Sequence, residues 1–211
     1  MLFTLKWLSN LFPLNEGNVH EDMKIHTIST DSRQTIKNGL FVPLVGDTFD
    51  GHDYLNQAIK RGVVATLWDK KRKLPNGLPL GFPVFFVEDT LVALQYLAKS
   101  YRTWVNPTVI GITGSNGKTT TKDLVFSVLK TSYRTYATEG NLNNHIGVPL
   151  TILRMPRNTE VLVVEMGMNH FGEIETLSNI AMPDISVITN IGESHIRSIA
   201  CLTVMRLSRL I

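Results

Sequence analysis

The second half of the chain alternates between short apolar runs and stretches whose apolar residues have helical spacing. The apolar runs are rich in β-branched residues, which is typical of strands that are buried on both faces of a parallel sheet. Amphipathic helices between such strands cover the two faces. We therefore predict strands at residues 108–113, 161–165 and 184–189 and helices at 118–132 and 173–181.

The first half has a more mixed pattern. Residues 70–83 are polar and rich in Pro and Gly, which predicts a loop. The apolar opening segment is interrupted by Lys6, Ser9 and Asn10, so a helix of a soluble protein is favoured over a signal peptide. We predict strands at residues 39–46, 63–68 and 83–89 and helices at 1–12, 53–62 and 90–104, the last capped by Thr90.

Asn106 and Pro107 stand where the two patterns meet, and we place the domain boundary there. Residues 1–106 would form a small N-terminal domain of mixed α/β structure. Residues 107–211 would form a central domain built on a parallel sheet, so the fold class that we expect is α/β.

Composition narrows the class of protein. The 211 residues suit one large domain or two small ones. The formal net charge is only +3 and the Lys and Arg residues are scattered, so nucleic acid is not an expected partner. No apolar run is long enough to span a membrane. Cys201 is the single cysteine, which excludes an intrachain disulfide and favours the reducing cytoplasm.

The segment GITGSNGKTTTKDL, residues 111–124, joins a predicted strand to a predicted helix. Gly114 and Gly117 would let the backbone turn tightly and approach an anion, and the start of the helix would attract phosphate. Lys118 would supply a charge for the phosphates and Thr119 a hydroxyl for Mg²⁺. Ile112 replaces the first glycine of the usual pattern, and the alternative is a Gly-rich turn with an exposed lysine.

Two further strands deliver polar residues to the same edge of the sheet, where ligands of α/β proteins gather. Glu165 ends one strand, at a position where phosphate-loop folds hold an acidic residue for Mg²⁺. Asn190, Gly192 and His195 follow another strand. The alternatives are that Glu165 marks the point where its strand leaves the core and that the histidine is structural.

Several segments resemble the Mur ligases, a family that builds the peptide of bacterial cell-wall precursors. The resemblance covers about residues 25–196 and is carried by GITGSNGKTTTKDL, TEGNLNNHIGVPLTIL, VVEMGMNHFGEIETLSNIAMPDISVITNIGESHI and STDSRQTIKNGLFVPLVGDTFDGHDYLNQAIKRG. The GNLNN and EMGMN segments are similar to the branch that adds D-Ala-D-Ala. The branch that adds the third amino acid shares the DSR segment but differs at these two places.

The resemblance implies roles for particular residues. Arg33 suits a phosphate or carboxylate, although the segment around it could also be a turn with a surface arginine. The implied ATP-binding residues are Gly114, Ser115, Asn116, Gly117, Lys118, Thr119 and Thr120. The implied magnesium ligands are Thr119, Glu165 and His195, and the implied catalytic residues are Lys118, Glu165 and His195. The implied substrate-binding residues are Asp31, Ser32 and Arg33 for the UDP-sugar and Asn143 and Asn144 for the acceptor peptide.

The implied activity is ATP-driven amide formation by way of an acyl phosphate, with ATP and Mg²⁺ as cofactors. The substrates would be UDP-N-acetylmuramoyl-tripeptide and D-Ala-D-Ala, and the protein would be a cytoplasmic monomer. The chain's share would be to hold two anionic substrates together and to offset their charge.

The resemblance is expected to end near residue 197. The segment RSIACLTVMRLSRLI has three arginines and no lysine, whereas relatives carry a carbamylated lysine there and then continue for about as long again. We therefore expect an incomplete ligase without turnover, whose shortened sheet leaves an edge strand and apolar helix faces uncovered. The alternatives are a binding remnant, another Mur-type ligase, and an unrelated phosphate-loop NTPase, which the first domain disfavours.

Overall fold

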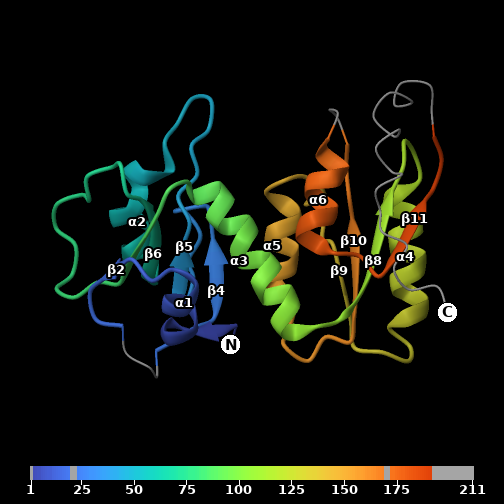
Figure 1. Ribbon diagram of the computed structural model, residues 1–211, viewed down its shortest axis with the longest axis horizontal. Coiled ribbons are helices and arrows are strands. Elements are labelled where there is room, and N and C mark those ends of the chain that lie inside the picture. The colour runs from blue at the N-terminus through green and yellow to red at the C-terminus, as the bar shows by residue number, and fades with distance from the viewer. Residues whose placement is uncertain (1, 20–22, 169–171, 192–211) are drawn as a thin grey trace. The chain divides into compact units, whose positions relative to one another are not determined.

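The computed structural model describes residues 2–19, 23–168 and 172–191, and the chain divides into two compact units, residues 1–97 and 98–211 (Figure 1). Helix α3, Thr90–Val105, contributes residues to both units. The domain limits of 1–106 and 107–211 stay a prediction. No described helix is long and apolar enough to cross a lipid bilayer.

The first unit is built on a five-stranded sheet with the strand order β2-β7-β6-β5-β4. The four strands from β4 to β7 are parallel, and β2 pairs with β7 in the antiparallel sense. Phe41, Leu55 and Trp68 lie at the centre of its core. The elements are β1 Phe3–Thr4, α1 Leu5–Leu11, β2 Asn15–Glu16, β3 Lys24–Ile25, β4 Thr27–Ser29, β5 Gly39–Phe41, the 3₁₀ turn η1 Gly51–Tyr54, α2 Leu55–Lys60, β6 Val63–Asp69 and β7 Val84–Val87.

The second unit is built on a parallel sheet with the strand order β11-β8-β10-β9. Alternate side chains of β8 and β10, among them Ile112 and Val163, pack against Val125 and Leu129 of α4. Helices α5 and α6 contact each other, α5 contacts β10 and α6 contacts β8, and Figure 1 shows both helices on the side of the sheet away from α4. The elements are β8 Thr108–Thr113, α4 Lys118–Leu129, β9 Thr135–Ala137, α5 Gly147–Arg154, β10 Val161–Glu165, α6 Glu173–Ala181 and β11 Ile185–Ile188.

The parallel α/β sheet of the second unit confirms the predicted fold class, while several details differ from the prediction. Thr90 does not cap α3: the Asp89 carboxylate accepts the Val92 N–H at 2.9 Å, and the Thr90 hydroxyl donates to the Pro43 carbonyl at 2.5 Å. The strand expected at 39–46 ends at Phe41, shortly before Pro43, which has no N–H to donate to a neighbouring strand.

Helix α5 and strand β9 were not predicted. The first seven residues of α5, Gly147–Leu153, are all buried, so the helix lacks the polar face that gives a helical period. Strand β9 has only three residues and is half-buried throughout. Both elements matter for the site because the segment between them carries Asn143 and Asn144.

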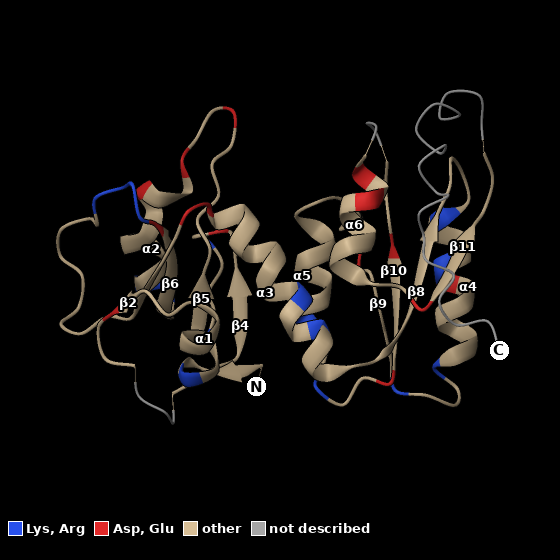
Figure 2. Ribbon diagram, in the orientation of Figure 1, with Lys and Arg blue, Asp and Glu red and all other residues tan. Residues whose placement is uncertain are grey.

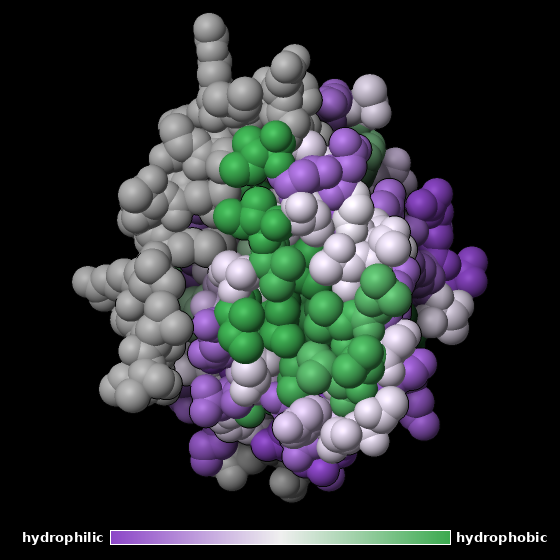
Figure 3. All heavy atoms as spheres, turned by 90° about the vertical axis from the view of Figure 1, so that its right-hand side faces the viewer, coloured by the Kyte–Doolittle hydropathy of each residue, from purple (hydrophilic) through white to green (hydrophobic). Residues whose placement is uncertain are grey.

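One face of the second unit carries exposed apolar side chains. Among the described residues β11 is an edge strand, and Ile185 and Ile188 on it are half-exposed. Leu124 and Val128 of α4 are about two-thirds exposed. Figure 3 views this side of the molecule and shows hydrophobic side chains gathered into one patch.

Candidate functional site

A glycine loop, residues 114–117, joins the end of β8 to the start of α4, and its two glycines have backbone angles that other residues rarely adopt. Gly114 has φ of 135° and Gly117 has φ of 79°. A Cβ on Gly114 would clash with the Thr189 side chain and lie 2.9 Å from the Asn190 carbonyl oxygen. Because of this crowding, the loop geometry depends on glycine at position 114.

Helix α4 begins directly after Gly117, and its first turn receives no side-chain cap from the described residues. The N–H groups of that turn and the positive end of the helix dipole are therefore suited to an anion. The Lys118 ammonium donates to the carbonyl oxygens of Gly114 and Ser115 at 2.7 and 3.2 Å. The lysine thus lies back across the loop, where a phosphate would meet both its charge and the helix start.

Thr189 and Asn190, which directly follow β11, form hydrogen bonds with the glycine loop. The Ser115 N–H donates to the Asn190 carbonyl at 3.1 Å, and the Asn116 N–H donates to the Asn190 side-chain oxygen at 2.9 Å. The Thr189 hydroxyl donates to the Asn116 carbonyl at 2.5 Å. Asn190 therefore lies at this edge of the sheet, as predicted, whereas Gly192 and His195 lie outside the described residues.

Glu165 ends β10 beside the start of α4, with which that strand is in contact. The residue is only 2% exposed, and its two carboxylate oxygens accept hydrogen bonds of 2.9 Å from Thr119 and Asn143. Its own N–H donates to the Thr138 hydroxyl at 3.0 Å. Figure 2 shows acidic residues in red and basic residues in blue on these elements. The structure thus brings together Thr119, Asn143 and Glu165.

This arrangement fits a magnesium ion by the chemistry of its donors. The Thr119 hydroxyl and the Glu165 carboxylate are hard oxygen donors in contact with each other, and Mg²⁺ is commonly held by one or two such groups together with phosphate and water. The described part of the chain has no cluster of three or more His, Cys, Asp or Glu residues that could hold a metal. The third predicted ligand, His195, lies outside the described residues.

Asn143 and Asn144, the last two asparagines of GNLNN, have different surroundings. Asn143 reaches Glu165, and its carbonyl accepts the Gly167 N–H at 2.8 Å. The Asn144 side-chain oxygen accepts the N–H groups of Ile146 and Gly147 at 3.1 and 2.8 Å, which satisfies donors at the start of α5. That these residues line a cleft for the acceptor peptide stays a prediction.

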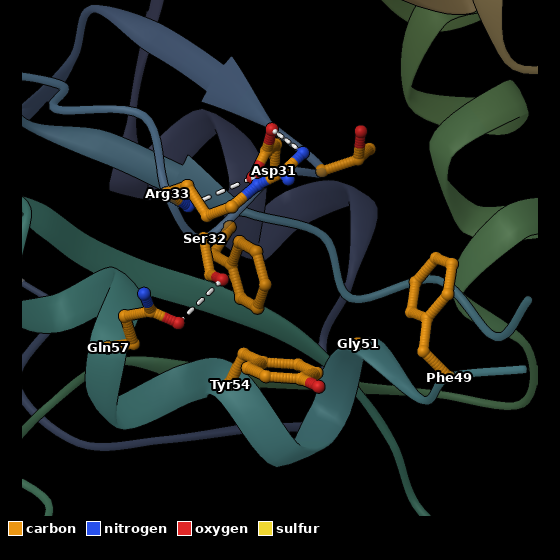
Figure 4. A pocket seen from close by; sticks show the side chains of 9 residues that line it. Asp31, Ser32, Arg33, Phe49, Gly51, Tyr54 and Gln57 are labelled. Carbon is orange, nitrogen blue, oxygen red and sulfur yellow. Dashed lines mark hydrogen bonds and ion pairs between the residues drawn. The ribbon is translucent and has the colours of Figure 1, made fainter.

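The first unit carries a separate pocket of about 470 Å³, which contains the predicted Asp31-Ser32-Arg33 segment (Figure 4). Phe49 and Tyr54, which form its aromatic wall, and Gln57 lie in the segment that resembles the Mur ligases, but no ligand role was predicted for them from the sequence. The lining residues are Thr30, Asp31, Ser32, Arg33, Phe41, Phe49, Gly51, Tyr54 and Gln57.

The polar side of this pocket is a network of short contacts. The Arg33 guanidinium makes two hydrogen bonds of 2.9 Å to the Asp31 carboxylate, which lower the pKa of that carboxyl below its usual value. The Ser32 hydroxyl donates to the Gln57 side-chain oxygen at 3.1 Å, as Figure 4 shows. Asp31 partly offsets the charge of Arg33. Because Arg33 is also largely exposed, its guanidinium remains open to solvent.

The aromatic side of the pocket includes Phe49 and Tyr54, which are 55% and 44% exposed. Exposed rings beside hydrogen-bonding groups are suited to a flat, polar ligand such as a nucleobase, because every base has a face that can stack.

Comparison with protein families gives two matches that together cover most of the chain. Residues 24–102 match the catalytic domain of the Mur ligase family, and residues 112–203 match the Mur ligase middle domain. The second match runs past residue 197, where the resemblance was expected to end.

Curated relatives agree with these matches. The chain is 54% identical over 180 residues to the UDP-N-acetylmuramoyl-tripeptide–D-alanyl-D-alanine ligase of Bacillus subtilis (strain 168), a match that covers 85% of the chain and 39% of that protein. It is 34% identical over 196 residues to the ligase of the same name from Escherichia coli (strain K12), covering 92% of the chain and 42% of that protein. The chain therefore spans about 40% of the length of these relatives.

Solved structures give the same result. A crystal structure of MurF from Acinetobacter baumannii superposes with a TM-score of 0.78 at 32% identity, over 94% of this chain and 43% of that one. The MurF ligase from Thermotoga maritima in complex with ADP superposes with a TM-score of 0.71 at 35% identity, over 83% of this chain and 40% of that one. With both family segments present, the chain belongs to the Mur ligase family.

Proposed function

We propose that the chain supplies the ATP site and the UDP-sugar site of an ATP-dependent ligase that adds D-Ala-D-Ala to UDP-N-acetylmuramoyl-tripeptide in peptidoglycan precursor synthesis. The observation that carries this proposal is the contact of Thr119 and Asn143 with the buried Glu165, directly beside the glycine loop and Lys118. The names of the relatives and the ADP complex of one of them support it.

In this proposal the residues from Gly114 to Thr120 bind the phosphates of ATP. Lys118 is already positioned at the loop by two carbonyl oxygens, so its charge can offset the phosphate oxygens without a large movement. The N–H groups at the start of α4 add fixed donors that cost little to reorganise when charge develops.

Thr119, Glu165 and His195 would hold Mg²⁺, which when bound offsets charge on the ATP phosphates. For the described members of this set, the structure offers a hydroxyl and a carboxylate already oriented toward each other. Asn143 fixes the second carboxylate oxygen, so that Glu165 cannot rotate freely.

The proposed reaction has two steps. An oxygen of the tripeptide carboxylate bonds to the γ-phosphorus of ATP and ADP leaves, which converts a poor electrophile into an acyl phosphate. The amine of D-Ala-D-Ala then bonds to the acyl carbon, loses a proton, and phosphate leaves from the tetrahedral intermediate. The residues of this chain act by holding the anionic groups together and offsetting their charge.

The pocket of the first unit is proposed to take the UDP part of the sugar nucleotide. Asp31, Ser32 and Arg33 present charged and polar groups, while Phe49 and Tyr54 present rings for the base. A cytoplasmic location and a monomeric state belong to the same proposal, and the single Cys201 agrees with a reducing compartment.

Isothermal titration with ATP and Mg²⁺ tests the nucleotide part. We expect Lys118→Ala to weaken ATP binding on the order of 10-fold to 100-fold, because a charge-assisted contact with phosphate is lost. Lys130→Ala, at the exposed far end of the same helix, is the matched control and should bind as the wild type does. Equal ATP affinity in Lys118→Ala and wild type would contradict the proposal.

A second candidate is that these residues bind both ligands without turnover by themselves; the chain spans about 40% of the length of the relatives that it matches. A phosphate-release assay with UDP-tripeptide, ATP, Mg²⁺ and D-Ala-D-Ala separates the two. Background release with intact ATP binding supports the second candidate, whereas release that needs all four components and is lost in Lys118→Ala supports the ligase.

A further inference from the structure

Lys122 is a buried lysine in the second turn of α4, on the same side of the helix as Lys118. It is 6% exposed, although lysine is rarely buried without a partner because desolvation of its charge is costly. Its ammonium donates to the carbonyl oxygen of the buried Thr138 at 3.0 Å and forms an ion pair of 2.9 Å with the exposed Asp123. No motif in the sequence assigns this side chain a role.

Thr138 connects Lys122 to the candidate metal site. It directly follows β9, and its N–H continues the pairing with β10 by donating to the Val163 carbonyl at 3.0 Å. Its hydroxyl accepts the N–H of Glu165, also at 3.0 Å. One residue therefore receives the lysine on its carbonyl oxygen and the backbone of Glu165 on its hydroxyl.

The contacts close into a ring. The Glu165 carboxylate accepts the Thr119 hydroxyl, and Thr119 lies three residues before Lys122 on the same helix. Helix α4 is thus tied to the end of β10 twice: directly by Thr119, and through Thr138 by Lys122. All four residues lie in the second unit.

We propose that Lys122 is a positioning residue that fixes Glu165 relative to Thr119 and so sets the geometry of the magnesium–phosphate site. The inference rests on the proposed function. Mg²⁺ demands near-ideal octahedral geometry, so a small shift of one carboxylate weakens its binding. The lysine itself acts through Thr138.

The choice of lysine at this position supports the proposal. An apolar side chain of similar length would fill the same space without the cost of desolvating an ammonium group, and such replacements are often neutral or stabilising. What an apolar side chain cannot do is donate to the Thr138 carbonyl. A costly buried charge beside the site is the pattern expected where local stability is given up for function.

The test compares ADP binding with and without a divalent cation. The variant is Lys122→Met, the matched control is Lys130→Met, and Mn²⁺ serves as the probe because its paramagnetic resonance spectrum reports its coordination. The measured quantity is the ratio of ADP affinity in Mn²⁺ to that in EDTA. We expect Lys122→Met to lower this ratio about 10-fold to 100-fold, while its ADP affinity in EDTA stays within about twofold of wild type.

A second variant, Thr138→Val, removes the hydroxyl that Glu165 contacts but keeps the carbonyl. It should lower the same ratio, and the double variant should lose no more than the stronger single one, since both act by one route. Thr138→Val also carries the test if Lys122→Met does not fold. A ratio equal to that of wild type in the folded variants overturns the proposal, as does a wild type whose ADP binding gains nothing from Mn²⁺.

Lys118→Ala separates this inference from the proposed function. It should weaken ADP binding in both Mn²⁺ and EDTA, because Lys118 is proposed to meet the phosphates themselves. A wild-type chain that does not bind ADP in either buffer contradicts the proposed function. Normal ADP binding in wild type with an unchanged ratio in Lys122→Met contradicts only the role of Lys122.

Discussion

In the second unit, Glu165, which is expected to meet magnesium, is held from within the protein, whereas in the first unit the expected charged ligand residues Asp31 and Arg33 are held mainly by each other at the surface. Glu165 is buried and receives bonds from α4 and from the segment before α5. Asp31 and Arg33 are two residues apart, pair with each other and are partly or largely exposed.

This difference bears on how each site is expected to work. A buried network keeps charged groups at fixed positions and makes each of them costly to disturb. An exposed ion pair contributes little by itself, because water screens it. The wall of the first pocket, in contrast, is built on regular elements: Phe41 lies in β5, Tyr54 in η1 and Gln57 in α2.

The largest effect is expected from Gly114→Ala in the second unit. The new Cβ would meet Thr189 and Asn190, and the positive φ would add strain of about 1–3 kcal/mol. ADP binding should fall below detection by isothermal titration. Gly140→Ala is the control: it has positive φ but open space around it, so it should cost about 1–2 kcal/mol of stability and leave ADP binding unchanged.

Tyr54→Ala tests whether the aromatic wall determines ligand binding in the first unit. Loss of a stacking surface should weaken UDP binding about 10-fold, within the usual range of 1–3 kcal/mol per stacked base. Tyr133→Ala removes a similarly exposed tyrosine from the second unit and should have no effect. Equal UDP affinities in the two variants would count against a stacked base in this pocket.

Arg33→Ala should have a smaller effect than Tyr54→Ala. Its guanidinium is already paired with Asp31 and exposed, so replacing it should change UDP affinity by no more than about fivefold. Fluorescence titration at low and high salt measures the change. A loss larger than that of Tyr54→Ala would mean that the charged segment, rather than the wall, determines binding.

The smallest effect concerns acid stability of the first unit. Burial alone would raise the pKa of Asp50, but hydrogen bonds from the His52 N–H and imidazole and the charge of Arg72 outweigh it and lower that pKa below 3.8. A carboxyl whose pKa is lower in the folded state than in the unfolded state stabilises the fold at pH values above its unfolded-state pKa. This stabilisation is lost as the pH falls through the folded-state pKa. Urea unfolding should therefore show that wild type loses more stability than Asp50→Asn between pH 4 and the folded pKa. Equal acid losses would contradict this account.

The sequence predicted the parts of the fold that have a clear period or a local motif. Strands β8 and β10, helix α6 and the glycine loop were expected where they occur, because their residues are either continuously apolar or locally constrained. Helix α5 was missed because both of its sides are buried. The cap of α3 was assigned to Thr90 one residue too late, since both Asp and Thr can cap and only the tertiary contact with Pro43 decides.

The candidate sites follow the same rule. Lys118 and Thr119 follow a glycine loop at the start of a predicted helix, and Glu165 ends a predicted strand. Their closeness at one edge of the sheet could therefore be expected from the sequence. Lys122 and Thr138 could not be assigned, because their connection depends on the packing of α4 against β9. A lysine four residues after Lys118 was the one available signal. The aromatic wall of the first pocket could not be predicted, because the nearness of its rings to Asp31, Ser32 and Arg33 depends on how separate elements pack.

We propose that each unit has its own ligand, nucleotide phosphate in the second and UDP in the first. Amide chemical shifts of isotope-labelled protein, titrated with ADP–Mg²⁺ and with UDP in separate experiments, test it most directly. We expect ADP–Mg²⁺ to shift the amides of residues 114–120 and of Glu165, and UDP to shift those of Ser32, Arg33 and Tyr54. ADP–Mg²⁺ that leaves the loop amides unmoved, or two ligands that shift the same residues, would contradict it.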